Sequence, residues 1–263
     1  MRPTPFSAMR RLSRAAAICA VLFLGVPGGG AQAHSRQGAP APLDLMPVEL
    51  ETRFALSALP PALRDQASVY VLERGGYRLD RQGASGLACL VQRTAWELVD
   101  YRDDIYIPLC YDAVGAETYL KVIRDTATLR AEGLSPEALK AEVERRYDRR
   151  DYRAPERPGI SYMVGPLMRT VGPPDLQVHT MSMPHLMTYA PGLTNADIGA
   201  MPDLAAPATL MFPFVDRQGN DEQAYIILMV GEAEKARIVS EGQPLLADLC
   251  GYRALLCLDS RHH

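Results

Sequence analysis

The segment HTMSMPHLM, residues 179–187, carries two of the five histidines in the chain and three of its eleven methionines. These residues occupy every second position, and successive side chains of a strand alternate between faces, so an extended strand would direct all five to one side. Imidazole and thioether groups are ligands that suit Cu(I). The pattern therefore predicts a soft-metal site for copper, with His179, Met181, Met183 and His185 as ligands.

Two other interpretations of the same region stay open. Methionine is a flexible filler of irregular cores, and Pro184 interrupts the alternation, so the odd positions also fit the inward face of an ordinary strand. His185, Tyr189 and Asp197 bring an imidazole, a phenol and a carboxylate close together in sequence, which suits a hydrolase-like acid–base site with His185 as base and Asp197 orienting it. Thr194 and Asp197 also fit a T-x-x-D capping arrangement, which gives Asp197 a structural role.

The N-terminal segment predicts export. Four arginines in the first fourteen residues precede a twelve-residue apolar run, Ala15 to Val26, and a small-residue site ending at Ala33. This pattern is typical of a secretory signal peptide over 1–33, and the run is short for a membrane span. We expect an exported protein, periplasmic or extracellular, with no membrane span after signal cleavage. Cleavage would leave His34 as an N-terminal residue able to chelate copper, although the Pro/Ala-rich arm over 34–47 offers it no partner.

Charge and motifs exclude several function classes. Removing residues 1–33 leaves 24 basic and 31 acidic residues, a balance that does not favour binding to nucleic acid. The arginine-rich segment 145–159 has acids interleaved, so it indicates a solvated helix end running into a linker. The sequence contains no G-x-S-x-G, H-E-x-x-H, P-loop or G-x-G-x-x-G motif. We recognise no characterised family in it.

Four cysteines remain after the signal peptide, which in an oxidising compartment predicts two disulfides. We expect Cys89–Cys110 and Cys250–Cys257, because each pair is close in sequence and local structure can close it. The first loop spans about twenty residues, which the loop-entropy relation converts to roughly 3 kcal/mol of stabilisation.

The helices and strands expected along the chain indicate an α+β fold, which must position these residues. We expect a mainly antiparallel sheet with two or three helices packed on one side. Over 48–263 we expect a single domain, with a possible sub-boundary near 150–159. Arg74-Gly75-Gly76 should close a hairpin, and Pro108 should confine its strand to a sheet edge. Ser135-Pro136 is a helix-start signal and Gly133 a helix-end signal. Strands are expected at 68–73, 77–81, 87–93, 104–110, 160–165, 176–183, 185–190, 209–215 and 224–230, and helices at 48–58, 117–131, from 135 and at 232–240.

From these observations we expect a binding or interaction module whose functional surface lies around residues 162–197, with a small molecule or a protein as its partner. The copper site and the acid–base site are the alternatives. The sequence does not decide among them.

Overall fold

The structure, a computed structural model, describes residues 43–258. The predicted signal peptide, His34 and most of the predicted arm lie outside the described residues. All of residues 43–258 fall within one compact unit, Gly38–His263. Its strands are β1 (Ser68–Glu73), β2 (Gly76–Arg81), β3 (Ala88–Gln92), β4 (Ile107–Tyr111), β5 (Ile160–Met163), β6 (Met168–Gly172), β7 (Gln177–Met181), β8 (His185–Tyr189), β9 (Phe214–Arg217) and β10 (Ala224–Met229).

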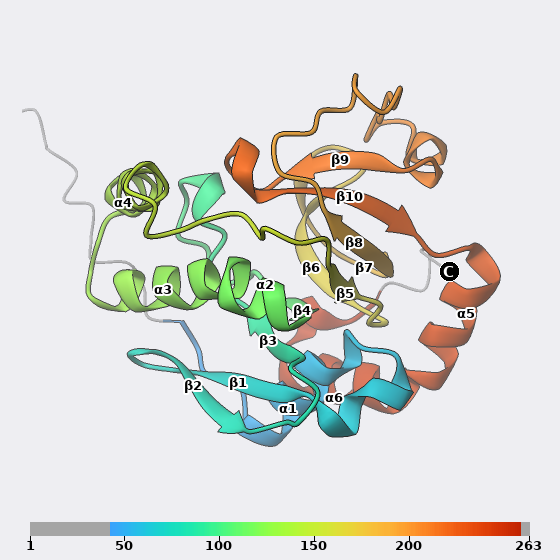
Figure 1. Cartoon of the computed structure of the whole chain (residues 1–263). Helices are drawn as coiled ribbons and strands as arrows, with labels where there is room; N and C mark the ends of the chain where they lie inside the picture. The colour runs from blue at the N-terminus through green and yellow to red at the C-terminus, as the bar shows by residue number, and fades with distance from the viewer. Residues whose placement is uncertain (1–42, 259–263) are drawn as a thin grey trace, which may run out of the picture. The chain divides into compact units, whose positions relative to one another are not determined.

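Eight of these strands form one sheet in the order β2-β1-β3-β4-β5-β8-β10-β9, while β6 and β7 form a separate hairpin (Figure 1). Of the pairs in the large sheet, β1 with β3 is parallel and the others are antiparallel. The predicted α+β class with a mainly antiparallel sheet is therefore confirmed.

The described residues contain six α-helices rather than two or three. They are α1 (Val48–Ser57), α2 (Ala113–Glu117), α3 (Tyr119–Ala131), α4 (Pro136–Asp148), α5 (Glu232–Glu241) and α6 (Gln243–Tyr252). Two of them escaped prediction for local reasons. The five residues of α2 depend on a single cap, in which the Asp112 carboxylate accepts a hydrogen bond from the Gly115 amide. Pro244 in the first turn of α6 allows a second helix to begin directly after α5.

The helices lie on both faces of the sheet rather than on one side. Phe54 of α1 and Leu249 of α6 share a core cluster with Cys89 and Cys110, whereas Leu120 and Ile123 of α3 pack with Leu90 on the opposite face. Figure 1 shows β3 between α3 and the pair α1 and α6. Strand residues one position apart therefore belong to different cores.

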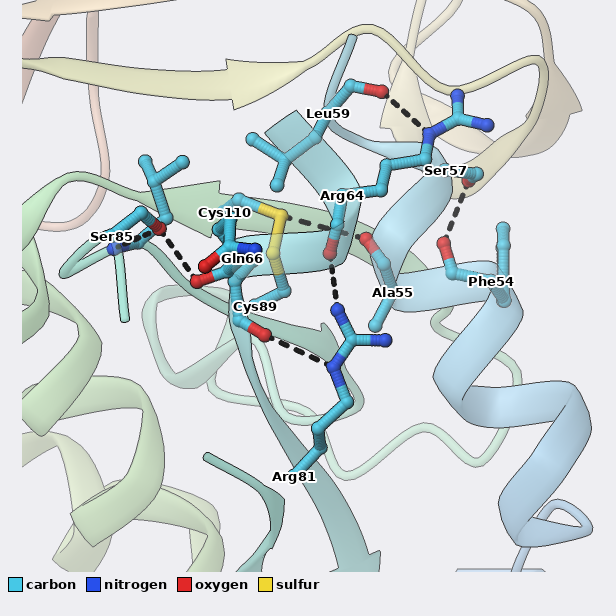
Figure 2. Close-up of a disulfide and its surroundings, with 12 residues drawn as sticks. Phe54, Ala55, Ser57, Leu59, Arg64, Gln66, Arg81, Ser85, Cys89 and Cys110 are labelled. Carbon is cyan, nitrogen blue, oxygen red and sulfur yellow. Dashed lines mark hydrogen bonds between the residues drawn. A yellow bond between two sulfur atoms is a disulfide. The ribbon is translucent and has the colours of Figure 1, made fainter. Parts of the chain in front are cut away.

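Both predicted disulfides, Cys89–Cys110 and Cys250–Cys257, are present. Cys89 and Cys110 are directly opposite on β3 and β4, with their Cα atoms 4.1 Å apart. Figure 2 shows this bridge beside α1, where the Cys110 sulfur lies 3.5 Å from the Ala55 carbonyl oxygen.

Several local predictions are also confirmed. Gly76 has φ +124° in the β1–β2 turn, and Gly133 has φ +92° after α3, both conformations that favour glycine. The Ser135 side chain accepts a hydrogen bond from the Ala138 amide at the start of α4.

Two strand predictions are wrong. Pro108 does not lie on an edge strand: β4 is internal, and it pairs with β5 only at Cys110 and Tyr111, beyond the residue that lacks an amide donor. The segment 209–215 begins in a 3-10 helix, Pro207–Met211, and only its last two residues belong to β9. Strand β6 was not predicted, because its five residues carry no clear alternation; it pairs with β7, and Arg169 also forms an isolated bridge with Tyr106.

Candidate functional site

An apolar groove lies on one face of β5 and β8. Tyr162 and Leu186 are directly opposite each other on these two strands, so their side chains share that face. Both line the groove, and Tyr162 packs against the core cluster formed by α1 and α6. The floor of the groove is thus set by strand alternation and register.

The walls of the groove are helical. One wall is the end of α1 and the 3-10 helix Pro61–Gln66, where Pro60 and Pro61 stop the helix and turn the chain. The opposite wall is α5 and the start of α6. At their junction a Cβ added to Gly242 would come within 2.8 Å of Pro166, so glycine permits this close approach. The apolar lining includes Leu56, Leu59, Val164, Val230, Ile238 and Leu245.

The groove has a volume of about 590 Å³. Ligand pockets of proteins occupy roughly 300–1,000 Å³ and are lined mainly by apolar groups with a few polar ones. The size and lining of this groove therefore suit one small organic molecule. A second cavity, of about 410 Å³ between α2 and residues 151–157, is lined by both acids and bases and lacks such an apolar wall.

Arg64 is the arginine of the groove that is free to meet a ligand. Arg53 is paired with Asp248 at 2.7 Å, and Arg237 is paired with Glu234 and Glu241 at 2.5 and 2.7 Å. The Arg64 Nε donates to the Leu59 carbonyl oxygen at 2.9 Å, but within residues 43–258 its terminal nitrogens make no ion pair or hydrogen bond. Figure 2 shows this bond, with the two terminal nitrogens turned away from it.

The partly buried environment of Arg64 strengthens its interaction with an anionic partner. The side chain is half-buried, and burial lowers the pKa of Arg64, against which the nearby Glu241 acts. A partly desolvated guanidinium with free N–H groups gains more from an anion than a fully hydrated one. The groove thus combines an apolar cavity with one arginine outside any ion pair of the described residues, and the carboxylates of Asp65, Glu234 and Glu241 also border it.

The predicted copper ligands divide between two strands of different sheets. His179 lies on β7, where its Nε2 is 2.6 Å from the Asp175 carboxylate and its side chain is 38% exposed. Met181, on the same strand, and Met183, which precedes β8, pack against the core cluster beneath α3. His185 begins β8 and is 3% exposed.

The structure does not join His185, Tyr189 and Asp197. His185 and Tyr189 share one face of β8 but are four residues apart, roughly 13 Å along a strand. The Tyr189 hydroxyl lies 2.9 Å from both an Asp112 carboxylate oxygen and the Ile160 carbonyl oxygen, and its single proton is shared between these two acceptors. The Asp197 carboxylate accepts from the Thr194 amide and hydroxyl at 2.8 and 2.6 Å. The T-x-x-D pair closes a turn here instead of capping a helix.

Among residues 43–258, no three His, Cys, Asp or Glu side chains gather closely enough to hold a metal ion. The described helices include none that is both long and apolar enough to span a bilayer.

No protein-family model, curated protein or solved structure matches the chain. The site must be interpreted from its own residues.

Sequence reasoning located only part of the groove. Tyr162, Val164, Pro166 and Leu186 fall within the predicted surface 162–197, but nothing in the sequence distinguished them from the alternate positions. The residues from α1, α5 and α6 were missed. The Pro60-Pro61 pair was a usable signal for a turn in that wall, whereas the long-range packing that closes the groove left no local signal.

Proposed function

We propose that this protein is exported, is cleaved after Ala33, and binds one small amphipathic molecule. The apolar body of the ligand occupies the groove over β5 and β8, and its anionic group pairs with the terminal nitrogens of Arg64. The observation that carries the proposal is a cavity of about 590 Å³ whose half-buried arginine makes no ion pair with the described residues.

Export is supported by the N-terminal charge and apolar pattern and by two disulfides, which persist in oxidising compartments. Expression of the full chain with its native N-terminus, followed by intact-mass measurement of the processed protein, tests this part. The expected mass corresponds to a chain that begins at His34 and has two disulfides. An uncleaved chain that remains in the cytoplasm would contradict it.

Ligand binding is tested with dodecanoate and dodecanol, which share an apolar tail and differ in the charged head. Both are titrated by calorimetry into the disulfide-bonded mature protein. We expect dodecanoate to bind with one-to-one stoichiometry and about tenfold or more tighter than dodecanol, because a charge-assisted hydrogen bond to Arg64 is made only by the carboxylate.

Arg64→Gln should remove this preference, leaving both ligands with similar affinity. Arg53→Gln is the matched control: it removes a groove arginine whose charge is already paired with Asp248, so the preference should persist. Leu186→Trp should block both ligands by filling the groove, with circular dichroism confirming the fold. Equal binding of the two ligands to the parent protein, or loss of the preference in Arg53→Gln alone, would refute the proposal.

A further inference from the structure

The opposite face of the same strands carries a row of soft-metal ligands. Met163 of β5 and Met229 of β10 are each directly opposite His185 of β8. Directly opposite residues of antiparallel strands point to one face, with Cβ atoms about 5 Å apart. The three side chains therefore stand side by side across the sheet, with the imidazole between two thioethers.

The hydrogen bond of His185 fixes which ring nitrogen carries the proton and which is free to bind a metal. Nδ1 lies 2.7 Å from the Met183 carbonyl oxygen, and since a carbonyl only accepts, Nδ1 carries the proton. In the neutral ring the lone pair then lies on Nε2. A histidine that ligates a metal through one nitrogen commonly donates the other N–H to such a carbonyl.

Nε2 is the nitrogen of His185 that is available to bind a metal ion. His185 is 97% buried, and the residues that the structure describes give Nε2 no hydrogen bond. Nε2 is therefore an acceptor without a partner among the described residues, in a side chain that shares its face of the sheet with the two thioethers.

The same core holds further thioethers. Six of the nine described methionines belong to the core cluster on this face or pack against it: Met163, Met168, Met181, Met183, Met187 and Met229. Thioether and imidazole donors without carboxylate oxygens select Cu(I) over harder cations.

We propose that Met163, His185 and Met229 bind a single Cu(I) ion through two thioether sulfurs and the His185 Nε2. This ligand set retains only His185 from the set that the sequence predicted. It lies on the face of the sheet opposite the groove, so it stands independently of the ligand-binding proposal.

The test is competition for Cu(I) with a chromogenic chelator, bicinchoninate, in ascorbate without oxygen, using the disulfide-bonded mature protein. We expect the parent protein to remove one equivalent of Cu(I) from the chelator. Met163→Leu combined with Met229→Leu keeps apolar side chains of similar volume and deletes both sulfurs, so affinity should fall about 100-fold or more.

The matched control is Met168→Leu combined with Met187→Leu, which deletes two buried sulfurs of the same core outside the row. The Cu(I) affinity of this control should remain within about threefold of that of the parent, because it changes core packing but keeps all three proposed ligands. Histidine ¹⁵N spectra with Ag(I), a redox-inert analogue, should move the Nε2 resonance of His185 and leave that of His179 in place. Failure of the parent to take one equivalent, an equal loss in the control, or an unmoved His185 resonance would each overturn the site.

Discussion

Neighbouring residues of β5 and β8 face opposite environments. Tyr162 and Leu186 line an open groove, whereas Met163 and Met187, one position along, are 6% and 1% exposed in a closed core. The groove face meets α1, α5 and α6, and the closed face meets α3 and the β6–β7 hairpin. The difference shows that strand alternation separates an open groove from a closed core.

The largest expected difference between the faces comes from truncating adjacent residues of β8. Met187→Ala should lower the free energy of unfolding by about 2–5 kcal/mol, because it leaves a cavity in a packed core. Leu186→Ala should lower the free energy of unfolding by less than about half that amount, since the Leu186 side chain borders open space. Urea unfolding of both variants measures this, and equal losses would mean that the groove closes in solution.

The pH dependence of the free energy of unfolding tests the burial of Glu51 in α1, the helix whose end forms one wall of the groove. Glu51 of α1 is 2% exposed, and burial raises its pKa to about 7, against the hydrogen bond that its carboxylate accepts from the Leu72 amide. Between the unfolded pKa of 4.5 and about 7 the folded state binds more protons, so stability is full below pH 4.5 and is lost as pH rises through 7. The shift corresponds to about 3 kcal/mol.

Glu51→Gln keeps an acceptor for Leu72 and cannot ionise. We therefore expect it to match the parent at pH 4.5 and to exceed it by up to about 3 kcal/mol at pH 8, measured by urea unfolding at both values. Subtraction of the parent removes the contribution of His185, whose lowered pKa acts with the opposite sign and destabilises the fold as the pH falls below 6.5. A pH-independent difference between the two proteins would contradict this assignment.

The smallest expected changes in stability come from substitutions of Ser161 and Tyr162, which are neighbours on β5. The Ser161 hydroxyl is buried on the closed face and has no hydrogen-bond partner within residues 43–258. Ser161→Ala should therefore stabilise the fold by about 1 kcal/mol, because it removes an unsatisfied polar group. Tyr162→Phe, on the groove face, should change stability by less than about 0.5 kcal/mol. Thermal unfolding of both variants checks this, and a destabilised Ser161→Ala protein would indicate a partner for the hydroxyl.

Features that depend on residues within about twenty positions of each other were predictable. The Ser135 cap, the glycine turns at Gly76 and Gly133, and both disulfides each depend on partners close in sequence. The histidine and methionine pattern at 179–187 was recognised, but its grouping was not, because His179 and His185 lie on strands of different sheets.

The sequence alone determined the α+β class, the cysteine pairs and the chemical character of the region around His185. Tertiary structure decided which strand residues face the groove, which thioethers flank the imidazole, and that Arg64 reaches an apolar cavity. The physical reason is that a strand supplies only an alternation of side chains. Which face becomes open or sealed depends on helices distant in the chain, from α1 near its start to α6 near its end, and Met163 and Met229 meet His185 only through the register of the assembled sheet.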